Sequence, residues 1–217
     1  MTWFFHVVTS SIGKKQCMAI SGLGLCLFLT VHLAGNLLLF AGPKVFNGYA
    51  ATIEANPLLI PSEIVLLFTF LVHICFAIPV TLENRKARPI RYVVSASKGR
   101  RTFASSTMWL SGVVTLVFIV LHLIDFKFAS RNGKTLYDLV VLKFQSWLYV
   151  VWYILASSIL ALHLSHGFQS AFRSLGLEHP KYTPFVEGVG KVFSVIVAVG
   201  YSLIPLGVFL GIVPSQK

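Results

Sequence analysis

Five long apolar segments constrain this chain more than any other feature of its sequence. Each is close to or above the roughly 20 residues that an α-helix needs to cross the hydrocarbon core of a bilayer. Segments this long and this apolar are hard to place in water. The sequence therefore predicts an all-α integral membrane protein with transmembrane helices over Cys17–Ala41, Ile64–Leu82, Phe103–Ile124, Ser146–Phe172 and Val192–Val213.

The composition agrees with a protein that lies almost wholly in a membrane. Of the 217 residues, 56% are hydrophobic and only 12% are charged, whereas a soluble domain carries about a quarter charged residues. No polar stretch is long enough for a separate soluble domain, so residues 1–217 are expected to form a single transmembrane domain. The first residues lack the small-residue cleavage site of a secretory signal, so we expect the first helix to be retained.

The positive charge is placed where membrane orientation needs it. A net charge of +11 would ordinarily indicate nucleic-acid binding, but here the Lys and Arg residues cluster between the apolar segments. The segment Glu83–Arg101 is the most basic, and cytoplasmic loops carry such an excess. We therefore expect a multi-pass protein with a cytoplasmic N-terminus, a cytoplasmic Leu175–Lys191 loop, and the C-terminus on the outer face.

Five of the seven histidines lie inside apolar segments. His6 and His179 lie outside them and are expected to be interfacial. Polar side chains within a membrane are costly and usually face the interior of the helix bundle, so a functional role is the first hypothesis. The five intramembrane histidines are His32, His73, His122, His163 and His166.

Depth in the membrane sorts four of these histidines into two pairs. With a rise of about 1.5 Å per residue, His32 lies roughly 25 Å from the inner surface, and His122 reaches a similar depth on another outward-running helix. His73 and His163 lie on inward-running helices, each roughly 15 Å from the inner surface. The sequence thus predicts an outer pair, His32 with His122, and an inner pair, His73 with His163.

Paired imidazoles on facing helices are typical axial ligands of haem iron. A hydrogen-bonded polar residue between helices explains one such histidine, but it explains two depth-matched pairs less well. Metal-ion transport would bring carboxylates or thiolates into the membrane, and the five apolar segments contain neither Asp nor Glu. Glycines beside the histidines leave room for a porphyrin or allow plain helix packing; these are Gly22, Gly24, Gly35 and Gly167.

His166 competes with His163 for the inner pair. The two are three residues apart and so share roughly one helix face. Spacing alone favours His163 only slightly, and His166 would otherwise bond a propionate or a backbone carbonyl.

The motifs that contain these histidines carry a resemblance to a known family. They are KQCMAISG at Lys15–Gly22, HLAGN at His32–Asn36, HICFAI at His73–Ile78, HLIDFK at His122–Lys127 and HLSHGFQSAFRSLG at His163–Gly176. In this combination the chain resembles the dihaem cytochrome b membrane subunit of succinate:quinone oxidoreductases and quinol:fumarate reductases, in its single-polypeptide, five-helix form. The resemblance implies a haem-binding four-helix bundle plus one peripheral helix.

The resemblance also implies ligands and partners. One axial histidine would come from each of the first four helices, which are His32, His73, His122 and His163, and the family pattern favours His163 over His166. Two haem b groups would pass electrons between menaquinone or menaquinol and an iron–sulfur subunit. A flavoprotein subunit with covalent FAD would perform the succinate/fumarate chemistry, and two such trimers would associate. The complex would serve respiration in a bacterial inner membrane, and reduction of fumarate would be part of anaerobic respiration.

Further site residues follow from the same resemblance. Counted from His32, Glu54 matches the acidic residue that contacts quinol near the outer haem, and it is our candidate for accepting quinol protons. Glu63 is the other candidate.

Independently of the resemblance, cations on the inner face are candidates for propionate contacts at the inner haem: Arg173 is the first, followed by Lys15 and by the hydroxyl of Ser21. Arg and Lys near helix ends also simply snorkel to the membrane surface.

Two other functions remain open from the sequence. One is the dihaem cytochrome b subunit of a hydrogenase or formate dehydrogenase, which shares the chemistry but not the HLAGN and HLSHG motifs. The other is a haem-free membrane anchor or transporter. A reduced-minus-oxidised optical spectrum distinguishes this haem-free protein from either of the two dihaem cytochromes.

Overall fold

The computed structural model describes residues 2–86 and 103–214. The described residues are 85% helical and contain no β-strand, as the sequence predicts. Its elements are α1 Thr2–Thr9, α2 Ser11–Leu37, η1 Leu38–Ala41, α3 Pro43–Glu54, α4 Leu59–Lys86, α5 Phe103–Ser106, α6 Met108–His122, η2 Leu123–Lys127, α7 Leu136–Phe144, α8 Trp147–Ser174 and α9 Thr183–Phe209.

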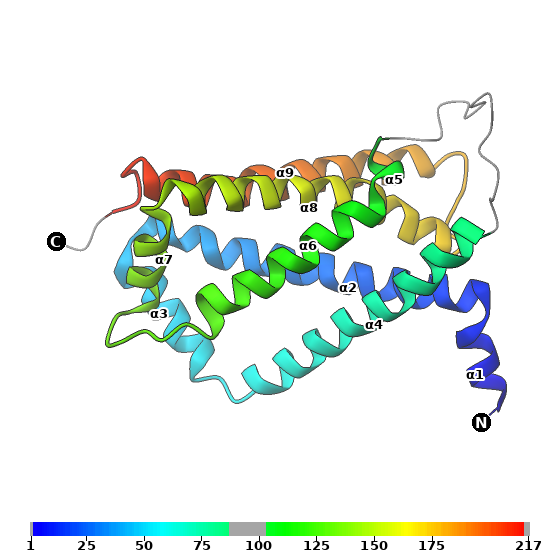
Figure 1. Ribbon diagram of the computed structural model, residues 1–217, viewed down its shortest axis with the longest axis horizontal. Helices are drawn as coiled ribbons and strands as arrows, with labels where there is room; N and C mark the ends of the chain where they lie inside the picture. The colour runs from blue at the N-terminus through cyan, green and yellow to red at the C-terminus, as the bar shows by residue number, and fades with distance from the viewer. Residues whose placement is uncertain (1, 87–102, 215–217) are drawn as a thin grey trace.

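Five of the described helical segments are long and apolar enough to cross a membrane. They overlap the five predicted spans but differ at most ends; the fifth, for example, runs from Thr183 to Phe209, where the sequence predicts Val192–Val213. These segments are Ser11–Ala41, Leu59–Lys86, Met108–Lys127, Trp147–Ser174 and Thr183–Phe209. α1 and the N-terminus lie at one end of the molecule, and the C-terminus, α3 and α7 lie at the other (Figure 1). We call these the N-terminal end and the C-terminal end.

Local signals explain where the long helices begin and end. The Ser10 hydroxyl accepts a hydrogen bond from the Gly13 amide at 3.0 Å and so caps the start of α2. α8 and α9 each end at a glycine in the left-handed region, Gly176 at φ 78° and Gly211 at φ 69°. The amide of Leu177 then reaches back to the Phe172 carbonyl at 3.0 Å, which satisfies a carbonyl at the end of the helix.

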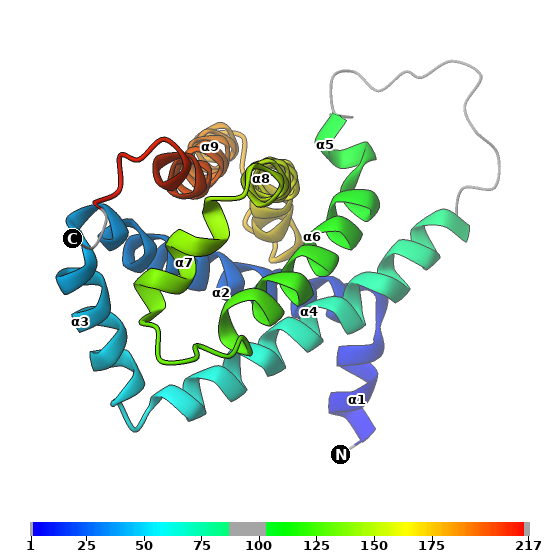
Figure 2. The same cartoon turned by 60° about the vertical axis from the view of Figure 1, so that its left-hand side comes forward.

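The helices are packed unevenly. α8 and α9 run side by side, and α2 packs along both of them (Figures 1 and 2). The fifth span, expected to be peripheral, is thus held against two others. α4 packs chiefly on α2, and α6 packs chiefly on α8. α4 and α6, all of whose residues are described, have one buried residue each, Val80 and Ser111.

The C-terminal end is closed by short helices over a hydrophobic core. α3 and α7 pack against each other and against the ends of the long helices. The core beneath them is formed mainly by Leu39, Phe46, Tyr137, Phe144 and Tyr153. Thr135 and Asp138 cap α7 by exchanging hydrogen bonds between their side chains and backbone amides. Most of the basic segment Glu83–Arg101 lies outside the described residues.

Candidate functional site

The structure brings four intramembrane histidines together in two pairs. His32 of α2 and His122 of α6 meet toward the C-terminal end, with ring centres 5.9 Å apart and planes at 87°. His73 of α4 and His163 of α8 meet toward the N-terminal end, with ring centres 6.4 Å apart and planes at 74°. These are the same pairs that depth along the helices predicts. We call them the outer pair and the inner pair.

The spacing within each pair fits two imidazoles that share one metal atom. Metal–nitrogen bonds of about 2 Å on opposite sides of a metal hold two ring centres roughly 6 Å apart. Both observed separations lie close to that value. Each pair supplies only two donors, and the described residues contain no group of three or more His, Cys, Asp or Glu side chains placed to hold a metal ion. The arrangement therefore fits a metal whose other ligands arrive with a cofactor, as in haem.

The inner histidines are oriented by hydrogen bonds through their Nδ1 atoms. His73 Nδ1 lies 3.0 Å from the Met18 carbonyl oxygen and 3.4 Å from Ser21 Oγ. His163 Nδ1 lies 3.2 Å from Ser111 Oγ. A donor N–H at Nδ1 leaves the Nε2 lone pair available for a metal, which is the usual arrangement for a histidine ligand.

Small residues stand beside the inner imidazoles. A Cβ atom at Gly22 would lie 3.1 Å from His73 Cε1, and one at Gly112 would lie 3.4 Å from His163 Cε1. Gly22 and Gly112 therefore leave room for the inner imidazoles themselves, and Gly112 was not singled out from the sequence. Gly35 makes room for another side chain, because its Cβ would lie 2.6 Å from the Tyr49 hydroxyl.

The face of α6 between the two pairs carries an unpaired hydroxyl. Ser111, Thr115 and His122 recur at helical spacing on this face. Thr115 Oγ1 is buried without a hydrogen-bond partner, and buried polar groups rarely stay unpaired. With the few buried residues of α4 and α6, this orphan hydroxyl fits a group that occupies the space between the helices.

Aromatic side chains surround the outer pair. Phe28 stacks on His32 with ring centres 5.1 Å apart. Phe118 and Phe126 lie 5.8 and 5.4 Å from the His122 ring. Such an apolar shell limits water around the outer imidazoles, and the surroundings of a metal site tune its properties.

Asp125 lies beside the outer pair, although the sequence assigns it no role, because it follows directly after the predicted span that ends at Ile124. The residues Leu123–Lys127 form a π-helical turn, closed by the Phe128 amide on the Leu123 carbonyl at 2.9 Å. This turn directs Asp125 inward, where the residue is only 9% exposed. Its carboxylate accepts hydrogen bonds from Lys143 Nζ at 2.8 Å and Tyr153 Oη at 3.2 Å. The position of Asp125 three residues after His122, and so on roughly the same helix face, was the one feature of the sequence that could have indicated its place in the site.

The ion pair between Asp125 and Lys143 is largely shielded from water. The hydrogen bond to Asp125 raises the pKa of Lys143 above its ordinary value. Lys143 therefore stays protonated at neutral pH and neutralises the buried carboxylate. Tyr149 also lies within 3.2 Å of Lys143 Nζ through its hydroxyl.

The two acidic candidates for quinol contact are both held in surface ion pairs. Glu54, the last residue of α3, is exposed and bonds to Arg131. The hydrogen bond from Arg131 lowers the pKa of Glu54 below its ordinary value. Glu63 is paired with Lys127. Both carboxylates lie at the C-terminal end, the end toward which the outer pair lies.

The candidates for propionate contact lie at the N-terminal end, in different surroundings. Arg173 forms ion pairs with Glu178 and Glu187. Lys15 is exposed. Ser21 is buried, donates to the Cys17 carbonyl at 2.7 Å, and lies beside the His73 ring. His166 is half-buried on α8, whereas it is His163 whose ring meets His73.

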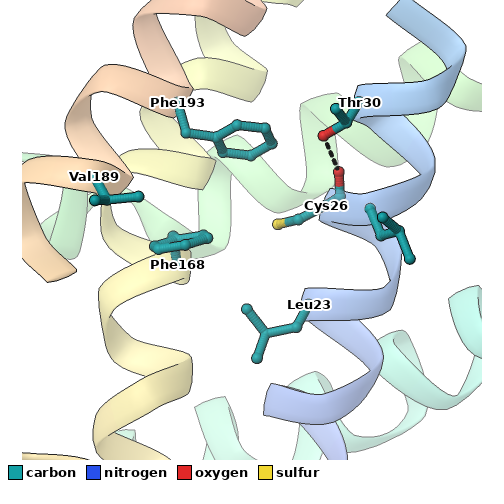
Figure 3. Close-up of a pocket in the computed structure, with 7 residues that line it drawn as sticks. Leu23, Cys26, Thr30, Phe168, Val189 and Phe193 are labelled. Carbon is teal, nitrogen blue, oxygen red and sulfur yellow. Dashed lines mark hydrogen bonds between the residues drawn. The ribbon is translucent and has the colours of Figure 1, made fainter.

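An apolar cavity of about 240 Å³ lies between α2, α8 and α9 (Figure 3). Its lining includes Leu23, Cys26, Phe168 and Phe193, which point toward one another in the close-up, and none of its residues is a histidine. The cavity is therefore separate from the two histidine pairs.

No protein family, curated protein or solved structure matches this chain significantly.

Proposed function

We propose that this chain is a dihaem cytochrome b that carries electrons across the interior of a membrane. The observation that carries the proposal is the pair of imidazole–imidazole contacts, 5.9 and 6.4 Å between ring centres, on four different helices. A haem held by two imidazoles supplies reversible one-electron chemistry. His32 and His122 would hold one haem, and His73 and His163 the other.

The proposal extends to the reaction partners through the resemblance of the histidine motifs. The chain would be the membrane anchor and quinone-reactive subunit of a respiratory succinate dehydrogenase or fumarate reductase. A flavoprotein and an iron–sulfur subunit would dock at the N-terminal end, on the cytoplasmic face of a bacterial inner membrane. Menaquinone would react at the C-terminal end, near the outer pair.

The residues of this chain divide the work in that reaction. The four histidines position the haems, and the aromatic shell around the outer pair excludes water. Glu54 would accept protons released by quinol at the C-terminal end. Because Arg131 keeps the pKa of Glu54 below its ordinary value, this carboxylate would become a better proton acceptor once quinol displaced the guanidinium.

The first test is a reduced-minus-oxidised optical spectrum of the purified protein together with a haem assay. We expect two b-type haems per chain. His73→Ala and His163→Ala should each remove the inner haem and leave the outer one, since the imidazoles of one pair share one metal. His166→Ala is the matched control and should keep both. A wild-type protein without haem, or loss of the outer haem alone from the inner-pair variants, would overturn the proposal.

The second test addresses the partners. The tagged chain should purify with a flavoprotein and an iron–sulfur protein that together oxidise succinate or reduce fumarate. A hydrogenase or formate dehydrogenase as the co-purified enzyme would keep the dihaem function and refute the succinate/fumarate assignment.

A further inference from the structure

The two histidine pairs differ in what holds their ligands. The inner histidines bond to neutral groups, the Met18 carbonyl and the Ser111 hydroxyl. His122 of the outer pair instead faces a tyrosine that is bonded to a buried carboxylate. This difference forms the basis of an inference that rests on the proposed function.

Four groups form a chain of contacts from the outer pair toward α7. His122 Nδ1 lies 3.5 Å from Tyr153 Oη. The same hydroxyl lies 3.2 Å from Asp125 Oδ2, and Asp125 Oδ1 lies 2.8 Å from Lys143 Nζ. Tyr153 and Asp125 are 6% and 9% exposed. This series of contacts is therefore shielded from water along most of its length.

The direction of each hydrogen bond follows from the donors and acceptors available. An ionised carboxylate only accepts, so the Tyr153 hydroxyl donates a hydrogen bond to Asp125. The tyrosine oxygen then has lone pairs left, and it accepts from an N–H at His122 Nδ1. This fixes His122 in the tautomer whose Nε2 lone pair is free, and Nε2 is then the atom available to iron.

We propose that Tyr153 and Asp125 are positioning residues that orient His122 and increase its electron donation to the outer haem iron. The Tyr153 hydroxyl is itself neutral, but its hydrogen bond to the Asp125 carboxylate makes its oxygen a stronger acceptor. A histidine ligand becomes a stronger base when its second nitrogen donates to a stronger acceptor. Greater donation favours the ferric state and lowers the reduction potential, and hydrogen bonding around an axial ligand is a known control of that potential.

Tyr153→Phe tests the proposal because it removes one hydroxyl and keeps the aromatic ring in the core. We expect two haems per chain, a higher midpoint potential for the outer haem, and an unchanged potential for the inner haem. The low-spin ferric EPR signal of the outer haem should also change, because it depends on the orientation of the axial rings. Redox titration followed optically measures both potentials.

Ser111→Ala is the matched control at the inner pair. It removes the hydroxyl beside His163 Nδ1 and should shift the inner potential alone. Where Tyr153→Phe fails to fold, Asp125→Asn gives the same measurement with the phenol retained, and it too should raise the outer potential. The single-histidine variants described above assign each potential to its pair.

The opposing results are separable. If wild-type protein carries two haems and the outer potential and EPR signal stay unchanged in both Tyr153→Phe and Asp125→Asn, the positioning role is wrong and the dihaem function stands. Absence of haem from the wild-type protein would overturn the proposed function itself, and the wild-type spectrum alone reveals it.

Discussion

Single side chains at the C-terminal end show how charge is distributed around the outer pair. Glu54 is exposed and Glu63 is half-buried, and both are paired near the surface, whereas Asp125 is buried and paired with Lys143. Surface ion pairs contribute at most about 1 kcal/mol to stability. The pair of Glu54 with Arg131 is therefore expected to matter for protonation more than for folding.

Arg131→Gln should change how stability depends on pH. Arg131 lowers the pKa of Glu54 below the ordinary value of 4.5, so the stabilisation is present above that value and is lost as the pH falls through the lower folded pKa. The variant should be slightly less stable than wild type at neutral pH and equally stable in strong acid. Thermal unfolding in detergent between about pH 6 and pH 3 measures the difference.

Lys134→Gln is the control for that prediction. It removes the same charge from the same loop, and Lys134 is exposed. Its pH profile should parallel that of wild type. Identical profiles for Arg131→Gln and Lys134→Gln would show that the hydrogen bond to Glu54 has no role of its own.

At the scale of helices, close approach of α2 to α4 depends on the absence of side chains. Gly22 lies against the His73 ring, and Gly24 lies against Thr69. These two glycines lie two residues apart on the same helix and differ in what a methyl group would meet. They therefore separate helix packing from the placement of a histidine.

Gly22→Ala should weaken binding at the inner pair. The added Cβ would lie 3.1 Å from His73 Cε1 and 3.3 Å from Nδ1, which is too close unless the ring moves. In Gly24→Ala the Cβ would lie 3.5 Å from Thr69 Cγ2, an ordinary contact. We expect the haem content at the inner pair to fall in the first variant and to stay unchanged in the second. Equal effects would indicate general helix packing.

The pairing of the histidines was predictable because straight helices convert residue number into depth. The burial of Asp125 was not, because it depends on a π-helical turn, and such a turn leaves no clear pattern of residue types. The surroundings of Gly35 were equally hidden, since Tyr49 reaches it from α3, a helix that lies between the first two predicted spans and was not itself predicted. Composition located the membrane spans but not the short helices that cover their ends.

For the whole molecule, the contrast is between a closely packed part and an open part. α2, α8 and α9 pack together, whereas α4 and α6 each have one buried residue. Contact with lipid explains one exposed face of a transmembrane helix. The inward faces of α4 and α6 would instead be completed by bound cofactor, which would link the stability of these helices to loading.

Haem depletion should therefore loosen the molecule unevenly. In hydrogen exchange on detergent-solubilised protein, α4 and α6 should exchange faster after depletion, because they lose packing partners. α8 and α9 serve as the internal control and should change little. A uniform increase over all five spans would contradict the division into a packed part and an open part.

The π-helical turn after His122 has a consequence for how this end of the protein can vary. Each residue of an α-helix advances by about 100°, and the wider turn at Leu123–Lys127 holds one residue more than an α-helical turn would. Removing a single residue there would rotate everything that follows relative to the histidine. Asp125 would leave the interior, and Lys127 would no longer face Glu63. The length of this one turn thus sets the angle about the helix axis between His122 and Asp125. Deleting one residue within it should move Asp125 away from His122 while both residues remain in the sequence.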